Sequence, residues 1–594
     1  MKKSKRLAAI ALSLVTVVAS AVSMMACDDD LRRGSDGEVQ DNSKTQLYVK
    51  NYQGGFGNKW LYNAKKKFEE IYKDAELETG RKGVQVLITE QKATPTYSEV
   101  SSDYFELYFS EDASYRTLVS QGAVADITDV ITQPNKYDVI DETTGTNKTI
   151  ASKMSDAQKN FYDMEGCYYA IPHYVSTPGL IYNIDLFRER GYYFKQGYEN
   201  ETSRDAKFIR PDSFDDNGNL SPDTVLSAGP DAQPGTYDDG LPATYADFWD
   251  LCEAITDDGN QALNWGSASS EFSYTTGLMI HLIGNNQGAE QFATNYTFEG
   301  VVKDPVIISG GKAQLNGDGT PQIGAPITLE PDKDNGENTI DGNGYETFKS
   351  ASVYYAMEFM GNWGKNYEKY SGGRYTNANN TGYTAFNAQR DYLISRLGRS
   401  KAGVQAILLD GTWWDCESSD DFKALADNGV SKEKCNYGWL PLPKATSDTV
   451  GQKGVIVNGV NFGYIKAGLS TMKENLAKDF LRLLNTDEAY ADFTACTNSF
   501  KDFKYELTEA QLNSLSSFGR SLYNDFQAKD VVNPIDNNDQ FLSTVYTTQA
   551  FRRYSSKNGA YVMAECKPKV GGNVATYFAQ TYNYNKKTYW RIGA

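Results

Sequence analysis

Two adjacent tryptophans, Trp413 and Trp414, are the side chains of this 594-residue sequence best placed to stack on a ligand. They follow the apolar stretch 405–411, which reads as a buried strand and ends in Gly411. Side chains just beyond the carboxyl end of such a strand project from the edge of the sheet, so we expect at least one ring to face a ligand. The alternative is that both rings pack inside the protein.

Glu111 and Asp112 are a second candidate pair, because they follow another predicted strand at 105–110. An ionised carboxylate offers several acceptor positions, held in a fixed place, to the hydroxyl groups of a ligand. The alternative is that both carboxylates belong to a solvated loop.

A glycine-rich loop at 52–57 follows the predicted strand 47–51 and includes Gly55 and Phe56. Glycine lets the backbone approach a ligand closely, so we include these two residues in the candidate site. A plain tight turn explains the same glycines almost as well.

The aromatic content indicates which ligand these groups would serve. The chain has 41 tyrosines, 27 phenylalanines and 8 tryptophans. A flat ring covers the C–H face of a sugar while neighbouring polar groups bind its hydroxyls, so the composition suits a carbohydrate. For any single ring, a place in the core or on a loop is still the simpler expectation. The net charge of −18 argues against nucleic acid or anionic lipid as the partner.

Histidine is scarce, with only His173 and His281 in the whole sequence. This excludes a metal site built from several histidines and leaves little general-base capacity near neutral pH. The sequence also lacks the GxSxG, P-loop and HExxH motifs. No catalytic residue and no cofactor are therefore expected.

An acidic loop near 229–240 carries Asp231, Asp238 and Asp239 among glycines, and such oxygen ligands suit calcium. The loop does not follow the EF-hand spacing. Calcium is therefore the minor hypothesis here, and an unliganded acidic loop is the main one.

The N-terminus has the pattern of an exported protein, with basic residues followed by the apolar run 7–22. The segment that ends in Cys27 resembles the lipobox of bacterial lipoproteins. This predicts a signal peptide at 1–26, a lipid on Cys27 and a flexible tether at 27–46. An ordinary signal peptide with an incidental cysteine is the alternative.

Cleavage before Cys27 would leave 568 residues, enough for two or more cores. Six cysteines would follow it, without CxxC or zinc-like spacing, and they could be free or paired. Cys416 with Cys435 is the pair the sequence favours.

Predicted strands at 47–51, 84–90 and 105–110 alternate with helical or irregular sequence. This alternation predicts a mainly parallel, doubly wound sheet, whose ligands bind beyond the carboxyl ends of the strands. The candidate loops described above occupy such positions.

Four segments resemble the extracellular solute-binding proteins of carbohydrate ABC importers, of the maltose-binding type. The segments YYAIPHYVSTPGLIYNIDLF and QAILLDGTWWD, at 168–187 and 405–415, are the specific ones. The segments at 110–131 and 438–464 follow the same order. Together the similarity covers most of residues 47–500.

The resemblance implies an α/β, two-lobed, type II periplasmic-binding fold, in which each lobe is a doubly wound mixed sheet and a hinge joins the lobes. It divides the chain as follows: lobe 1 at 47–175 plus about 460–520; lobe 2 at 180–455, with surface-loop insertions at 190–245 and 300–345; and a C-terminal segment at 521–594 that completes the lobes.

The resemblance also favours Trp413 as the sugar platform and Tyr274 as a ring facing it across the cleft. Trp265 is close to Tyr274 in sequence and could serve instead. The implied function is that of a monomeric lipoprotein on the outer face of the cell membrane. It would bind an oligosaccharide and deliver it to the transmembrane subunits of an ABC importer.

Two other functions stay open. A surface glycosidase could use two of the 77 acidic residues as its catalytic pair. A binding protein for another solute, such as a peptide or a polyamine, is the second, because cations also stack on aromatic rings.

Overall fold

The computed structural model describes residues 32–91, 93–111, 115–215, 218–266, 272–297, 299–330, 333–334, 340–371, 383–399, 403–532, 563, 566 and 571–588. Cys27 and the predicted signal peptide lie outside these ranges. Within them, no helix has both the length and the apolar character that a membrane span requires.

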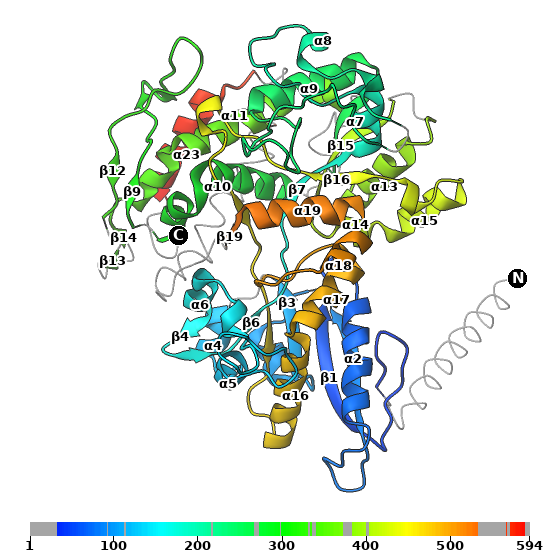
Figure 1. Cartoon of the computed structure of the whole chain (residues 1–594). Helices are drawn as coiled ribbons and strands as arrows, with labels where there is room; N and C mark the ends of the chain where they lie inside the picture. The colour runs from blue at the N-terminus through cyan, green and yellow to red at the C-terminus, as the bar shows by residue number, and fades with distance from the viewer. Residues whose placement is uncertain are drawn as a thin grey trace, which may run out of the picture.

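Two main sheets, each packed on its own hydrophobic core, organise the chain into a lower and an upper body (Figure 1). The lower sheet has the order β2-β1-β3-β18-β6. In it β1 pairs parallel with β2 and β3, whereas β18 pairs antiparallel with β3 and β6. Its strands are β1 (Thr45–Tyr52), β2 (Val84–Gln91), β3 (Leu107–Glu111), β6 (Ile171–Pro172) and β18 (Asn461–Ile465).

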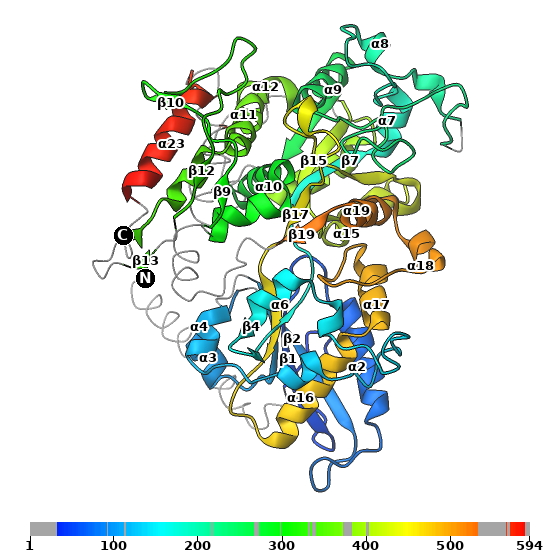
Figure 2. The same ribbon diagram turned by 60° about the vertical axis from the view of Figure 1, so that its left-hand side comes forward.

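Helices cover both faces of the lower sheet. One face carries α2 (Lys59–Ile71), α16 (Thr471–Leu484) and α17 (Asp487–Thr497), which pack on one another. Apolar residues recur at helical spacing along α16, and the ring centroids of Phe68 and Phe480 lie 4.9 Å apart at its contact with α2. The other face carries shorter helices (Figure 2). They are α3 (Tyr97–Ser102), α4 (Tyr115–Ser120) and α6 (Asp156–Tyr162).

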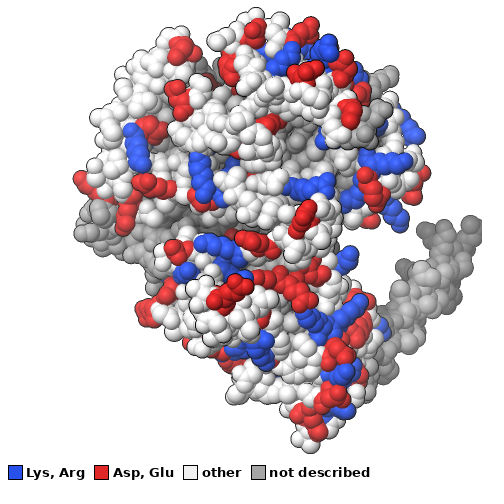
Figure 3. Space-filling view, in the orientation of Figure 1, with Lys and Arg blue, Asp and Glu red and all other residues white. Residues whose placement is uncertain are grey.

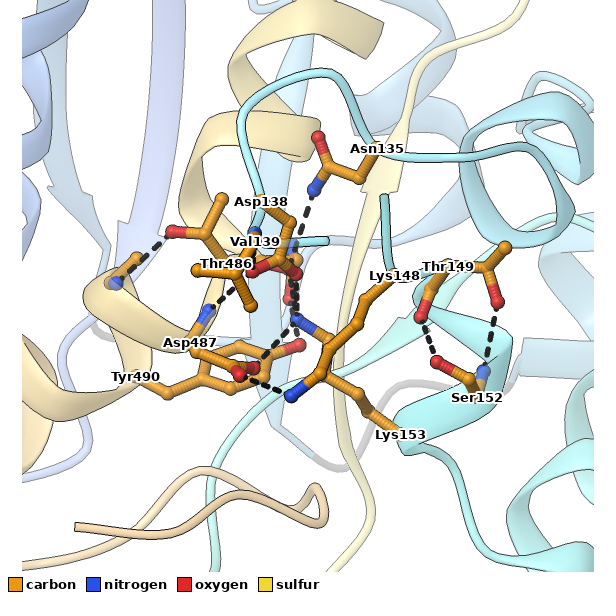
Figure 4. A network of polar contacts seen from close by, with 12 residues as sticks. Asn135, Asp138, Val139, Lys148, Thr149, Ser152, Lys153, Thr486, Asp487 and Tyr490 are labelled. Carbon is orange, nitrogen blue, oxygen red and sulfur yellow. Dashed lines mark hydrogen bonds and ion pairs between the residues drawn. The ribbon is translucent and has the colours of Figure 1, made fainter. Parts of the chain in front are cut away.

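A buried lysine links two segments of the lower body through polar contacts (Figure 4). Lys153 is 3% exposed, and its ammonium bonds Asp138, the carbonyl oxygen of Asn485 at 2.8 Å and Asp487 at 3.2 Å. It also lies 4.6 Å from the ring centroid of Tyr490. Burial alone would raise the pKa of Asp487, but its lysine partners lower it below the ordinary value. The network therefore ties the segment before α6 to the start of α17.

The upper sheet has the order β16-β7-β15-β8. Here β7 is antiparallel to both β16 and β15, and β15 is parallel to β8. Its strands are β7 (Pro178–Asn183), β8 (Gln261–Trp265), β15 (Gln405–Gly411) and β16 (Tyr437–Leu440). The α/β class is thus confirmed, with mixed rather than mainly parallel sheets.

The helices of the upper body surround this sheet. They are α7 (Ile184–Arg190), α8 (Arg204–Lys207), α9 (Tyr245–Asp257), α10 (Phe272–Thr297), α11 (Ala351–Lys365), α12 (Tyr367–Tyr370), α13 (Ala385–Ser395), α14 (Trp414–Glu417), α15 (Ser419–Asp427), α19 (Ser517–Ala528) and α23 (Val574–Thr588; Figure 2). The short strands β17 (Val455–Val457) and β19 (Asp530–Val532) pair parallel beside α10.

The chain passes between the bodies three times, near 173–177, 457–461 and 498–502. These crossings are hydrogen-bonded to one another, because Gly459 N donates to Ser176 O and Val175 N donates to Phe500 O, both at 2.9 Å. The side chain of Asn458 accepts from Ser176 N at 2.7 Å. The three segments therefore form one connection.

The third crossing changes the predicted division of the chain. The expected lower-body segment 460–520 ends near Thr497, and α19 beyond it packs against β16 of the upper body. Helix α23 packs on α11, so the described part of the C-terminal segment completes the upper body. The sequence carries no local signal that the chain returns to the upper body after Thr497, because a segment that crosses between bodies has the same pattern as any other short extended segment.

The predicted surface-loop insertion at 190–245 is a loop only in part. Tyr192, Phe194 and Phe208 are buried in the upper core, and the ring centroids of the last two lie 4.4 Å apart. By contrast, short strand pairs build much of the 300–345 insertion, which is largely exposed where it is described.

The favoured disulfide is absent from the structure. The six cysteines that it describes are free thiols. The Cys416 thiol donates to the carbonyl oxygen of Phe56, and the Cys435 thiol donates to that of Ser431. Pairing Cys416 with Cys435 was therefore wrong.

Candidate ligand-binding site

A cavity of about 730 Å³ lies between the two bodies, and residues from both of them and from the crossings line it. This volume is within the usual range of sites that enclose a small organic ligand. On the face shown in Figure 3, acidic and basic side chains are interspersed over both bodies, without a continuous basic surface.

The lower sheet supplies one wall through the ends of three parallel strands. Tyr52, Gln91 and Glu111 are the last residues of β1, β2 and β3, and all three line the cavity. Parallel strands end at the same edge of a sheet, which is why residues so far apart in sequence meet here. The edge therefore places a phenol ring and a carboxylate at the cavity, whereas the amide nitrogen of Gln91 donates to Phe109 O and Ser110 Oγ, both at 3.1 Å.

Glu111 is held in place by a crossing residue, because the Tyr174 hydroxyl donates to its Oε1 at 2.7 Å. Gly54 lies against this pair. A Cβ there would lie 2.3 Å from the Tyr174 hydroxyl oxygen and 2.8 Å from Glu111 Oε1. A glycine at this position is therefore what leaves room for the oriented carboxylate.

The opposite wall comes from the upper body and contains Trp413, which follows β15, and Tyr274 on α10. Their ring centroids lie 5.3 Å apart at an interplanar angle of 55°. Trp413 is 8% exposed and packs with the core of the lower body, although its own strand belongs to the upper one. The two rings together form an angled aromatic surface.

Glycines on both sides make room for the Trp413 ring. A Cβ on Gly411 would lie 2.3 Å from the ring, and a Cβ on Gly55 would lie 2.9 Å from Trp413 Cβ. Gly55 also has a positive φ of 79°, which other residues adopt at a cost. The structure therefore places four of the residues predicted to contact a ligand at the cavity: Gly55, Trp413, Tyr274 and Glu111.

Three other predicted residues do not reach the cavity. Trp414 has no exposed surface and packs on Tyr437, with ring centroids 5.2 Å apart. Trp265 packs edge to face on Trp363 at 5.1 Å, and Phe56 packs on Tyr174 at 4.5 Å. The structure therefore does not bring Trp414, Trp265 and Phe56 to this cavity, because these rings fill the cores.

Asp112 lies outside the described residues. The calcium hypothesis stays a prediction. The loop's own groups bind only some of its carboxylate oxygens, since Asp239 Oδ1 is buried with no hydrogen-bond partner among the described residues. Asp238 accepts from the Asp231 amide at 3.0 Å and from the Thr236 hydroxyl at 2.6 Å, and Asp239 accepts from the Gly235 amide at 2.7 Å. Among the residues that the structure describes, no cluster of three or more acidic, histidine or cysteine side chains could hold a metal ion.

Both histidines are buried away from the cavity. Burial lowers the pKa of His281 to about 4. His173 stacks on Phe109 with centroids 4.5 Å apart, and its Nδ1 lies 2.8 Å from the ammonium nitrogen of Lys501. Burial and this lysine lower the pKa of His173 well below its ordinary value. Neither ring is placed to act on a ligand in the cavity.

Phe386 and Glu417 also line the cavity, although neither was predicted from the sequence. Phe386 is in the first turn of α13, and Glu417 ends α14. Gln389 donates to Glu417 Oε2 at 2.6 Å. Nothing local in the sequence distinguishes these two residues from others on helix surfaces, since their position depends on how the helices pack.

Comparisons with known proteins give only distant matches. No family model matches the chain, and no characterised protein is significantly similar to it in sequence. A chitin oligosaccharide binding protein is similar in structure with a TM-score of 0.49 and 12% identity, over 91% of this chain and 99% of that one. A cyclic α-maltosyl-1,6-maltose binding protein from Arthrobacter globiformis has a TM-score of 0.47 and 12% identity, over 91% and 98%.

Proposed function

We propose that this protein is a solute-binding lipoprotein that captures an oligosaccharide between its two bodies and delivers it to an ABC importer. The observation that carries the proposal is the composition of the cavity. The angled rings of Trp413 and Tyr274 line the cavity together with the strand ends that carry Tyr52 and Glu111. Carbohydrate recognition requires aromatic rings that stack on the faces of the sugar units and fixed polar groups that bind their hydroxyls.

In this proposal the two bodies are the lobes of a type II periplasmic-binding fold, and the three crossings are its hinge. A ligand that contacts both lobes stabilises the closed arrangement over the open one, and the importer recognises the closed shape. This work needs no catalytic group. The return of β18 to the lower sheet, where it pairs with β3, is consistent with such a hinge.

Membrane attachment and the importer partner rest on the N-terminal sequence and on that resemblance. Expression in a bacterial host with labelled palmitate tests the anchor. We expect label on the native chain and none on Cys27→Ser. Equal labelling of both chains would contradict lipidation at Cys27.

A thermal-shift screen tests ligand binding. The panel should contain di- to hexasaccharides of α-1,4-glucose, β-1,4-glucose, β-1,4-xylose, β-1,4-mannose and β-1,4-N-acetylglucosamine, with spermidine and a tripeptide as non-sugar probes. A ligand at 100 times its Kd stabilises the folded state by about 2.7 kcal/mol, which raises the melting temperature measurably. If only spermidine or the tripeptide raised the melting temperature, the cavity would be assigned to a solute other than a sugar.

A glycosidase is the second candidate, and one observation favours it. Glu111 and Glu417 line the same cavity from opposite bodies, and a glycosidase uses two carboxylates on either side of the scissile bond. Chromatography of each oligosaccharide after overnight incubation separates the two functions. Unchanged sugar supports the binding protein, whereas shorter products that disappear in Glu417→Gln would support the enzyme.

A further inference from the structure

Phe386 differs from the other aromatic residues of the cavity in its exposure. Its side chain lines the cavity and yet is 61% exposed, whereas Trp413 is 8% exposed. A residue that both lines a cavity and faces solvent lies at the rim. A single exposed apolar residue needs no explanation elsewhere on a surface, but this one is at the entrance to the site.

Two contacts fix the backbone around Phe386. Thr384 caps the helix through a reciprocal capping box with Asn387, which sets where α13 begins. The start of α13 also lies directly against the residue that follows β8, because a Cβ on Gly266 would lie 2.6 Å from the amide nitrogen of Ala385. Phe386 is therefore presented by a rigid support.

The same support is tied to the inner part of the site. Gln389, one turn after Phe386, donates to Asp410 Oδ2 at 3.0 Å and to Glu417 Oε2 at 2.6 Å. Asp410 belongs to β15, the strand that leads into Trp413. The rim ring and the inner ring are thus held on connected elements of the upper body, at a set separation.

We propose that Phe386 forms an outer stacking subsite, so that the protein selects oligosaccharides by length. One sugar unit stacks inside on Trp413 and Tyr274, and a more distant unit of the same chain stacks on Phe386 at the rim. A chain too short to span both positions gains nothing from Phe386. This inference rests on the proposed carbohydrate function.

The test is isothermal titration of native protein, Phe386→Ala and Phe386→Trp with the di- to hexasaccharide ladders named above. For the series that the native protein binds, we expect Phe386→Ala to weaken the longer members about tenfold, equivalent to about 1.4 kcal/mol, and to leave the disaccharide unchanged. Phe386→Trp should restore the affinity for long chains, because it restores a ring. Tyr97→Ala is the matched control, since Tyr97 is also an exposed aromatic residue and is not among the described residues that line the cavity.

Three results would overturn the inference. An equal loss at every length would make Phe386 part of the inner site, and no loss at any length would remove it from the site. If the native protein binds no member of any ladder, the proposed function itself fails. That last result is seen in the native protein alone, so it is distinguishable from a failure of the subsite.

Discussion

Trp413 and Trp414 are neighbours with opposite surroundings, and their substitution should have different effects. Trp413→Ala removes a ring from the cavity, so we expect ligand affinity to fall by about 1–3 kcal/mol, the cost of losing an aromatic anchor. Trp414→Ala empties a fully buried site, so we expect the free energy of unfolding to fall by about 3–5 kcal/mol. Titration calorimetry and urea denaturation measure the two quantities. Unchanged affinity in Trp413→Ala would exclude that ring from the site.

Glu358 on α11 should make stability depend on pH. Burial raises its pKa to about 7 in the folded protein, against about 4.3 in an unfolded chain. Between these values the folded state holds a proton that the unfolded state has lost, so this group's contribution to stability decreases as pH rises through the window. Glu358→Gln keeps the neutral form. It should be more stable than the native protein at pH 8, by up to about 3 kcal/mol, and equal to it near pH 4.

Urea denaturation at the two pH values measures this difference, with Glu368→Gln, on the next helix, as a matched control. A stabilisation of Glu358→Gln that is the same at both pH values would contradict a titrating carboxyl and indicate better packing instead.

The sequence identified part of the site because strand ends have a recognisable pattern. Glu111, Gly55 and Trp413 follow predicted strands, and the structure places them at the cavity. Which of two adjacent tryptophans faces a cavity depends on the turn from β15 into α14, which sends Trp413 and Trp414 to different sides. Phe386 could not be found from sequence, since a helix start gives no sign of its tertiary neighbours.

At the level of elements, Lys153 should be required for the stability of the lower body. Lys153→Met would leave the buried carboxylate of Asp138 and its neighbour Asp487 without their shared cation. Breaking a buried ion pair by removing one partner costs about 3–5 kcal/mol, so we expect a loss of that size in urea denaturation.

Lys67→Met is the matched control, because Lys67 pairs with Glu488 on the same helix α17 but is 47% exposed. Exposed pairs contribute about 0–1 kcal/mol. If the two substitutions lowered the free energy of unfolding equally, burial of the Lys153 network would make no extra contribution to stability.

The predicted strands coincide closely with the observed ones, since 405–411 is β15 and 84–90 lies within β2. Continuous apolar runs are a strong signal for buried strands. The antiparallel members of both sheets and the third crossing near 498–502 were harder to predict. Strand direction and body membership follow from long-range pairing, which single-sequence periodicity does not contain.

At the level of the whole molecule, we expect that the two bodies must move apart before a ligand can enter or leave the cavity. A Cβ on Gly57 of the lower body would lie 3.8 Å from Cys416 Sγ of the upper body, so Gly57→Cys places two thiols within reach of a disulfide. Burial raises the pKa of Cys416 to about 11, so a copper–phenanthroline oxidant is needed to form the bond efficiently. We expect the oxidised variant to bind its sugar much more slowly in stopped-flow fluorescence, and reduction to restore the native rate.

Gly57→Cys combined with Cys416→Ser is the control, because it has the same backbone substitution but cannot form the bond. Mass spectrometry establishes the cross-link. An oxidised variant that exchanges ligand at the native rate would show that the bodies need not separate.

The position of β18 also affects how the protein forms during synthesis. This strand lies between β3 and β6, so the lower sheet is incomplete until the ribosome has added Ile465. The four strands of the upper sheet end at Leu440 and are all available earlier. A nascent chain can therefore complete its second sheet before its first one. Strands β1, β2 and β3 can pair with one another early, but the outer edge of β3 gains its partner only when β18 is made, more than three hundred residues later.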